Sequence, residues 1–196
     1  IILGGENISA ELLQIVSHLS NEVYATFGMT ETISHIALKR LSGKNADKHF
    51  KLLSGIKIST DENNRLVIKA PHLGQPNLTT NDIVQIFSEK EFDWHGRIDN
   101  VINSGGIKIH PEEIEQKLQS IIKCPFFITS LPDKRTGEKL LLAVEGSVFS
   151  DKNKEELAEY IGTLQKLQQP KAILLFEQFA RTENGKIKRN ETLLLP

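Results

Sequence analysis

The spacing of apolar residues predicts that the first half of the chain is built mainly from strands. Behind Ser9, which can cap a helix, apolar residues repeat at helical spacing, so IILGG is expected to be a strand end that turns into a helix. VYATFG is a further strand-like run. KLLSGIKISTDENNRLVIKAP predicts two strands joined by the turn-rich DENN, and NDIVQIF adds a third. Together these segments predict a small sheet or barrel.

Helices and strands are mixed in the second half. Pro111, with two glutamates behind it, predicts the start of a helix. FFITSL and KLLLAVEG predict strands around the turn PDKRTGE, and KAILLFE predicts a third strand. A second helix is expected to begin near Ser150 or Asp151 and to run until Pro170 prevents its continuation. This βαββαβ-like order is typical of a compact α+β domain.

The change of pattern near residue 97 predicts two domains in an α/β (α+β) chain. A length of 196 residues fits two domains of ordinary size. We expect residues 1–97 to carry the small sheet or barrel and residues 98–196 to form the compact α+β domain.

Composition limits the classes of partner. With 24 Lys+Arg against 25 Asp+Glu the net charge is -1, so no general field draws the chain to nucleic acid or to an anionic membrane. No apolar run approaches the ~20 residues that a membrane-spanning helix needs. The single cysteine, Cys124, excludes an internal disulfide framework and favours a reducing compartment, so we expect a cytoplasmic protein.

The segment YATFGMTET combines residue types that suit a nucleotide site. The aromatic face of Phe27 can stack on a purine, and Gly28 lets the backbone approach a ligand closely. The Thr30 hydroxyl can donate to a phosphoryl oxygen, and the Glu31 carboxylate can hold Mg²⁺. The alternative is that Phe27 and Met29 are ordinary core residues and that Thr30 and Glu31 begin a helix.

Three segments in this order, YATFGMTET, FDWHGRIDNVINSGGIKIHPEEIE and ENGKIKR, resemble motifs of the adenylate-forming ligases. That superfamily contains acyl-CoA and aryl-CoA synthetases, firefly luciferase and the adenylation domains of peptide synthetases, which activate a carboxylate with ATP. The resemblance covers nearly the whole chain. It implies that residues 1–97 are the remainder of a large N-terminal nucleotide-binding domain and that residues 98–196 are a small, mobile C-terminal domain.

The resemblance also implies roles for residues near the start of the chain. It assigns Phe27 to adenine stacking, Thr30 to the α-phosphate and Glu31 to the metal ion. The family usually has tyrosine in place of Phe27, and the loss of its hydroxyl should leave stacking intact. Gly5 and Glu6 occupy the place of the family's Gly-rich strand end that lines the adenine and acyl pocket. Taken alone, they indicate only a turn.

The ribose is expected to bind Asp82 and Arg97. Asp82 falls where the family usually has Thr-Gly-Asp, and its carboxylate can accept hydrogen bonds from both sugar hydroxyls, although Asn81 here replaces the glycine. The guanidinium of Arg97 could reach the ribose as well. The alternatives are that Asp82 is a polar residue heading a strand and that Arg97 forms a surface ion pair.

The middle segment implies a hinge. In the family, the small domain rotates between two half-reactions about a residue at the position of Asp99, and a short segment free of proline can change orientation through a few backbone dihedrals. Gly106 matches the glycine that lines the tunnel for the pantetheine arm of CoA. Alternatively, Gly105 and Gly106 form only a hairpin turn.

Lys186 is the candidate catalytic cation. When a carboxylate attacks the α-phosphorus of ATP, negative charge concentrates on the non-bridging oxygens and on the departing pyrophosphate, and a flexible ammonium can meet both. The family pattern is Pro-x-Thr-x-x-Gly-Lys-x-x-Arg, and Ala180 stands here in place of the proline. The alternative is a solvated basic turn.

The function implied by the resemblance is a ligase that uses ATP, Mg²⁺ and CoA and takes a small-molecule carboxylate. The family's phosphate-binding loop has no counterpart in these residues, and the acyl pocket should lie largely with it. We therefore expect the chain to be the C-terminal portion of such an enzyme, inactive alone and possible as a homo-oligomer. A non-catalytic module that binds a nucleotide or a partner is the alternative from another class.

Overall fold

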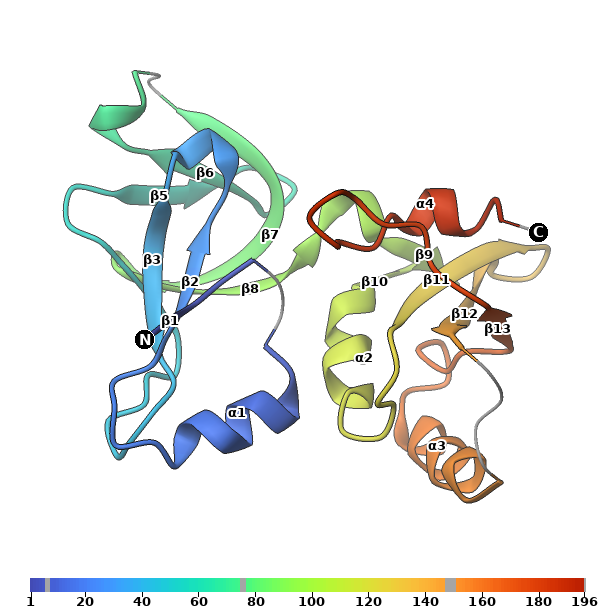
Figure 1. Cartoon of the computed structure of the whole chain (residues 1–196). Coiled ribbons are helices and arrows are strands. Elements are labelled where there is room, and N and C mark those ends of the chain that lie inside the picture. The colour runs from blue at the N-terminus through green and yellow to red at the C-terminus, as the bar shows by residue number, and fades with distance from the viewer. Residues whose placement is uncertain (6–7, 75–76, 147–150, 196) are drawn as a thin grey trace. The chain divides into compact units, whose positions relative to one another are not determined.

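The computed structural model describes residues 1–5, 8–74, 77–146 and 151–195. The chain forms two compact units, Ile1–Asp99 and Asn100–Pro196 (Figure 1). The first unit contains an eight-stranded sheet and the second a five-stranded sheet. Both units also contain helices, which confirms the predicted α/β (α+β) fold class.

The sheet of the first unit has the strand order β1-β2-β3-β4-β8-β7-β6-β5. β1 and β2 pair in parallel, and the other neighbours are antiparallel. One helix, α1 (Ala10–Ser17), follows β1. The strands are β1 (Ile2–Leu3), β2 (Tyr24–Gly28), β3 (His35–Arg40), β4 (Phe50–Leu52), β5 (Lys57–Thr60), β6 (Arg65–Lys69), β7 (Leu78–Ser88) and β8 (Glu91–Arg97).

Local signals placed the predicted elements of this unit correctly. Ser9 caps α1, because its Oγ accepts a hydrogen bond from the Leu12 N–H at 3.2 Å. In the DENN turn between β5 and β6, Asp61 Oδ1 accepts from the backbone N–H groups of Asn63 and Arg65, both at 2.9 Å. Both bonds join residues that are close in the sequence, so the local sequence is enough to predict this turn.

The sequence analysis did not predict β3, β4 or β8. β8 shows the alternation of a half-buried strand, since Phe92 is fully buried and the side chain of Trp94 packs against the same cluster. The same residues also carry the predicted hinge motif, and their alternation predicts a strand as well. In the structure it pairs with β4 and β7 in the middle of the sheet.

The sheet of the second unit has the order β10-β9-β12-β11, with β13 also paired to β12. β13 runs parallel to β12, and the remaining pairs are antiparallel. The elements are β9 (Ile102–Ser104), β10 (Ile107–Ile109), α2 (Pro111–Leu118), β11 (Phe126–Asp133), β12 (Gly137–Glu145), α3 (Asp151–Thr163), β13 (Ile173–Phe176) and α4 (Arg189–Thr192).

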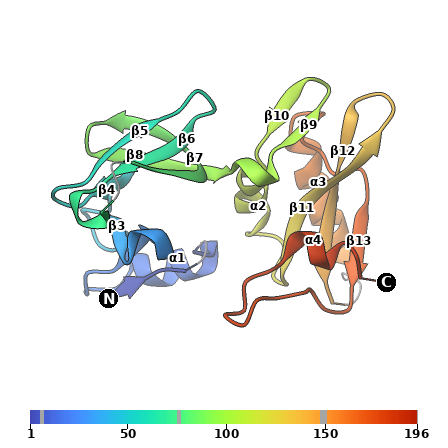
Figure 2. The same ribbon diagram turned by 90° about the horizontal axis from the view of Figure 1, so that it is seen from above.

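The five-stranded sheet lies between α2 and α3 on one side and α4 on the other (Figure 2), and alternate residues of β11 and β12 belong to two different clusters. Ile128 and Leu142 belong to the cluster that includes apolar residues of α2 and α3. Phe127 and Ala143, one position along each strand, belong to a second cluster with Phe179. The sheet is therefore covered by two helices on one face and by the chain after β13 on the other.

Two boundaries in this unit differ from the prediction. The expected seven-residue turn PDKRTGE is shorter, because Pro132 and Asp133 still pair with β12. α3 ends at Thr163, well before Pro170. Just after the helix, the side-chain amide of Gln169 donates to the Leu164 carbonyl at 2.9 Å. This side chain takes the place of the backbone N–H that would bond to the same carbonyl if the helix continued.

Candidate functional site

Asp82 and Arg97 face each other across β7 and β8 as directly paired residues. Arg97 Nη1 lies 3.9 Å from Asp82 Oδ1. The same oxygen accepts a hydrogen bond from Trp94 Nε1 at 2.9 Å. The Asp82 side chain is 12% exposed and that of Arg97 is 46% exposed. A carboxylate held by a partly buried indole and a guanidinium that reaches solvent together form a site able to bind a diol.

Asp99 is fixed by two neighbours in the first unit. It lies in a single helical turn, Ile98–Asn100, and its Oδ2 accepts from Arg97 Nη2 at 3.1 Å and from Asn81 Nδ2 at 3.0 Å. Arg97 thus does form an ion pair, as the alternative reading expected, and it bridges Asp82 and Asp99. The sequence analysis treated Asn81 only as a departure from the family pattern and missed its contact with the predicted pivot.

Phe27 packs into the core of the first unit. Its ring makes edge-on contacts with Phe92, at 5.1 Å between centroids, and with Phe50, at 5.8 Å. Met29 also packs against this cluster. These contacts are the ones expected if Phe27 is a core residue. Phe27 is only partly buried, and adenine stacking would require an accessible part of its ring. The role of Phe27 toward a nucleotide stays a prediction.

Thr30 and Glu31 are exposed on a short helical turn, Thr30–Thr32, directly after β2. Buried Thr32 holds this turn, because its Oγ1 lies 2.8 Å from the Met29 carbonyl and accepts from the Met29 N–H at 3.0 Å. The two predicted residues therefore project from an anchored turn. β2 and β7 are not neighbours in the sheet, so this turn and the Asp82 pair lie on separate strands.

Ile33, the next residue, has a backbone conformation that the sequence gave no reason to expect. Its φ is 66°, and the residue is 80% exposed. A β-branched residue rarely adopts a positive φ, so the turn after Glu31 is strained. No signal in a single sequence identifies such a residue.

The two glycines predicted near the nucleotide differ in their surroundings. A Cβ added to Gly28 would lie 2.6 Å from His35 Cα and 2.7 Å from the Ser34 carbonyl oxygen, so β2 and β3 approach too closely for any side chain. Gly5 has φ +105° and open space around it. Glu6, predicted beside it, lies outside the described residues.

Gly105 and Gly106 form the turn of the β9–β10 hairpin, as the structural alternative expected. Their φ values are 60° and 81°, and Ser104 pairs with Ile107 across the turn. Nothing lies within 4 Å of a Cβ built on Gly106, whereas one on Gly105 would lie 3.0 Å from Leu167 Cδ1. Gly106 therefore faces open space in its own unit, and the tunnel role stays a prediction.

Lys186 is exposed on a small hairpin that closes on itself. Arg181 and Ile187 form an antiparallel bridge across the hairpin. The Thr182 N–H donates to the Lys186 carbonyl at 2.8 Å, and the Lys186 N–H donates to Thr182 Oγ1 at 3.1 Å. The backbone of Lys186 is thus fixed while its ammonium is free to reach a ligand.

Two carboxylates hold the ends of this hairpin, the partly buried Glu145 and the buried Glu115. At the start, Arg181 Nη2 pairs with Glu145 Oε2 at 2.5 Å. At the end, Arg189 forms two hydrogen bonds with Glu115, at 2.8 Å and 2.9 Å. Burial raises the pKa of the Glu115 carboxyl, and the charge of Arg189 opposes that rise.

A metal ion at this site would depend on Glu31. In the part of the chain that the structure describes, no three His, Cys, Asp or Glu side chains are grouped so as to hold a metal ion. Mg²⁺ is commonly held by one or two carboxylates together with substrate phosphates and water. One exposed carboxylate such as Glu31 fits that mode, which needs no preformed cage.

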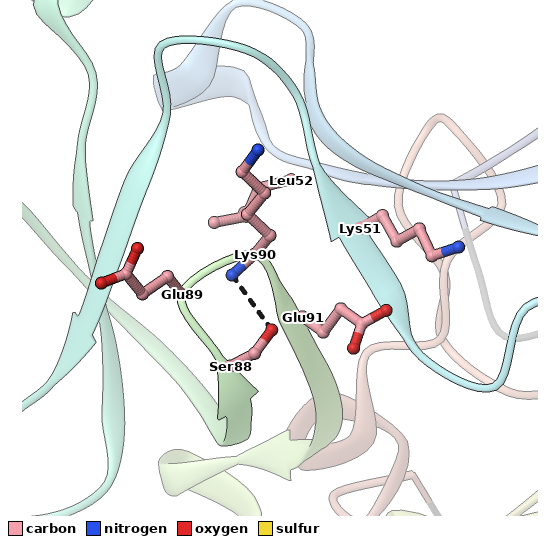
Figure 3. Close-up of a pocket in the computed structure, with 6 residues that line it drawn as sticks. All are labelled: Lys51, Leu52, Ser88, Glu89, Lys90 and Glu91. Atoms are coloured by element: carbon pink, nitrogen blue, oxygen red, sulfur yellow. Dashed lines mark hydrogen bonds between the residues drawn. The ribbon is translucent and has the colours of Figure 1, made fainter.

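A cavity of about 600 Å³ lies beside the β7–β8 turn (Figure 3). None of the predicted site residues lines it. The lining carries lysine and glutamate side chains that point in different directions around an open hollow. The residues around the cavity are Lys51, Leu52, Ser88, Glu89, Lys90 and Glu91. The cavity is therefore not part of the candidate site.

Comparisons with known proteins point to one group of enzymes, although no family model matches the chain. The chain is 28% identical to the 2-succinylbenzoate–CoA ligase of Lactococcus lactis, over 97% of this chain and 46% of the relative. It thus spans about half the length of the curated relatives that it matches.

Among the described residues, no helix is long and apolar enough to cross a membrane.

Solved structures give the same result. An AMP-forming acyl-CoA synthetase/AMP-acid ligase II-like protein from Dyadobacter fermentans is 36% identical, with a TM-score of 0.52, over 98% of this chain and 56% of that one. The o-succinylbenzoate CoA synthetase of Bacillus subtilis, in complex with its acyl-adenylate intermediate, is 22% identical with a TM-score of 0.81, over 100% of this chain and 46% of that one. These relatives confirm the resemblance that the motifs indicated.

Proposed function

We propose that this chain is the C-terminal part of an ATP-dependent carboxylate–CoA ligase. In the first half-reaction a carboxylate oxygen attacks the α-phosphorus of ATP, forming an acyl adenylate and releasing pyrophosphate. In the second, the CoA thiol attacks the acyl carbon, forming a thioester and releasing AMP. ATP, CoA and the carboxylate are the substrates, and Mg²⁺ would neutralise phosphate charge when bound beside Glu31.

The observation that carries this proposal is the in-register pair of Asp82 and Arg97 at the end of β8. Asp82 would accept hydrogen bonds from the ribose hydroxyls, and Arg97 would donate to the sugar or to a phosphate oxygen. Thr30 would donate to the α-phosphate. Lys186 would meet the charge that develops during adenylation, since its side chain is exposed on a fixed backbone.

For the carboxylate we propose o-succinylbenzoate, which would place the reaction in menaquinone biosynthesis in the cytoplasm. The segments GRIDNVINSGG, HPEEIE, FGMTET and LQQPKAILLF are most similar to those of o-succinylbenzoate–CoA ligases. The relative from Lactococcus lactis carries that activity in its name. Another acyl- or aryl-CoA synthetase shares parts of the same segments and is the second candidate.

Pyrophosphate exchange by the full-length protein that contains this chain tests the proposal. A panel of carboxylates would include o-succinylbenzoate, benzoate and a long-chain fatty acid. We expect exchange of label into ATP that depends on o-succinylbenzoate and on Mg²⁺, followed by thioester formation when CoA is added. Exchange with another acid alone would reassign the substrate. Absence of exchange with every acid, together with retained ATP binding, would favour a non-catalytic nucleotide-binding module.

A further inference from the structure

Arg189 ends the segment ENGKIKR, which also carries Lys186, and two carboxylates of α2 face it. Its Nη1 lies 2.8 Å from Glu115 Oε1, and its Nη2 lies 2.9 Å from Glu115 Oε2. Glu112 Oε1 is 3.7 Å from the same Nη2. The two parallel bonds to Glu115 fix the plane of the guanidinium as well as its position.

The carboxylate of this pair is buried, the Arg189 side chain is 24% exposed, and the pair has further partners. The side chains of Glu115 and Glu112 are 9% and 4% exposed. The Ile128 N–H donates to Glu115 Oε1 at 2.7 Å, and the Arg189 guanidinium lies 5.5 Å from the centre of the Phe127 ring. Removal of Arg189 would leave the buried charge of Glu115 uncompensated, so the pair strongly resists separation.

The same network reaches the first residue of the second unit. Asn100, which follows the predicted pivot, donates from Nδ2 to Glu112 Oε1 at 2.5 Å. α2 therefore holds the start of the unit through Glu112 and the end of the Lys186 hairpin through Glu115. Arg189 faces both carboxylates, so it links the two ends of the unit's chain in one buried cluster.

We propose that Arg189 and Glu115 are positioning residues for Lys186, an inference that rests on the proposed function. Neither would touch a reactant. They would hold the backbone at the end of the hairpin so that the Lys186 ammonium arrives in one place when the unit reorients, without a separate ordering step. A misplacement of about 1 Å can cost a catalytic group on the order of a hundredfold in rate, so a loosened hairpin should slow adenylation.

The test compares Arg189→Met with Lys188→Met in the full-length protein. Lys188 is a matched control, because it is a cation in the same segment whose partner, Glu191 at 2.9 Å, is a surface residue. For Arg189→Met we expect the kcat of o-succinylbenzoate-dependent pyrophosphate exchange to fall roughly 10- to 100-fold with little change in the KM for ATP. Transfer from supplied acyl adenylate to CoA should stay near the wild-type rate, and Lys188→Met should behave as wild type.

A second readout does not depend on activity. Trypsin can cut after Lys186 in both variants, and we expect faster cleavage there in Arg189→Met than in Lys188→Met. Glu115→Gln, which keeps an acceptor for the Ile128 N–H, should show the same two effects and serves if Arg189→Met does not fold. Equal losses in both half-reactions, or unchanged exchange and cleavage, would overturn the positioning role. A wild-type protein that exchanges with no carboxylate would instead refute the proposed function, and the cleavage result would then decide the positioning role alone.

Discussion

Arg97 Nη1 lies 3.9 Å from Asp82 Oδ1, while Nη2 of the same guanidinium is 3.1 Å from Asp99 Oδ2. One arginine thus contacts both the residue predicted to bind ribose and the residue predicted to be the pivot. Since Arg97 is 46% exposed, these pairs contribute little to folding stability. Their value lies in placing a cation where the nucleotide and the hinge are expected to meet.

Asp82 should be tested with asparagine as well as alanine. Alanine would leave the partly buried Trp94 N–H without its acceptor, whereas asparagine keeps an oxygen there and removes the charge. We expect Asp82→Asn to weaken ATP binding in the full-length protein and to leave the Mg²⁺ requirement unchanged. Glu31→Gln should instead raise the Mg²⁺ concentration needed for half-maximal pyrophosphate exchange.

Both variants would be titrated with ATP at saturating Mg²⁺ and with Mg²⁺ at saturating ATP. Since Glu31 is exposed, its substitution should leave the melting temperature unchanged. Identical Mg²⁺ titrations for Glu31→Gln and wild type would remove Glu31 from the site. An Asp82→Asn protein with wild-type ATP affinity would remove Asp82.

Lys186→Ala should cut adenylation by on the order of a hundredfold or more and spare thioester formation from a supplied acyl adenylate. The reason is that the charge Lys186 meets develops only when pyrophosphate departs. Pyrophosphate exchange and acyl transfer would be measured separately, with Lys188→Ala as the control in the same segment. Equal losses in the two half-reactions would contradict the assignment.

Gly28→Ala should destabilise the fold through the backbone rather than through the nucleotide. The new methyl group would meet His35 Cα at 2.6 Å and the Ser34 carbonyl oxygen at 2.7 Å, and backbone cannot move aside cheaply. Overpacking of this kind typically costs about 1–3 kcal/mol. Gly162→Ala is the control, because nothing lies within 4 Å of its Cβ.

Chemical denaturation of both variants would check this. We expect a lower midpoint for Gly28→Ala and an unchanged or higher one for Gly162→Ala, since alanine favours helix over glycine. A Gly28→Ala protein as stable as wild type would show that β2 and β3 can separate there, and closeness to a ligand would then be the better reason for glycine at this position.

Features set by neighbouring residues were the ones that the sequence predicted well. The Ser9 cap, the DENN turn and the strand Ile173–Phe176 depend on contacts or patterns within a few residues. β8 was also within reach, because Phe92 and Trp94 alternate with polar residues. The hinge motif lies on the same residues, so two signals overlap in this segment.

Contacts between distant segments could not be predicted in the same way. Glu115 and Arg189 are 74 positions apart, and no spacing rule links a helix residue to a loop arginine at that separation. The strained φ of Ile33 likewise results from how β2 and β3 are joined. Glu115 and Arg189 both lie in segments that resemble family motifs, yet only the fold shows that they touch.

The hinge prediction concerns two positions, Asp99 and Gly106. Asp99→Pro would restrict φ at the predicted pivot and constrain the backbone of Ile98. It would also remove the carboxylate that accepts hydrogen bonds from Arg97 and Asn81. At Gly106 the substitution is asparagine, because φ is 81° and asparagine tolerates a left-handed backbone. Its side chain would extend into open space, where the pantetheine arm is predicted to pass.

Both variants should retain pyrophosphate exchange in the full-length protein, and both should lose transfer of the acyl group from isolated acyl adenylate to CoA. The causes differ, since Asp99→Pro would block reorientation and Gly106→Asn would obstruct the thiol. Melting temperatures would show whether either change damages its own unit, and Asp99→Ala separates the loss of the carboxylate from the restriction of φ. If Asp99→Pro and Gly106→Asn both transfer the acyl group at the wild-type rate, rotation about Asp99 is the wrong description, and the second half-reaction must proceed without that reorientation.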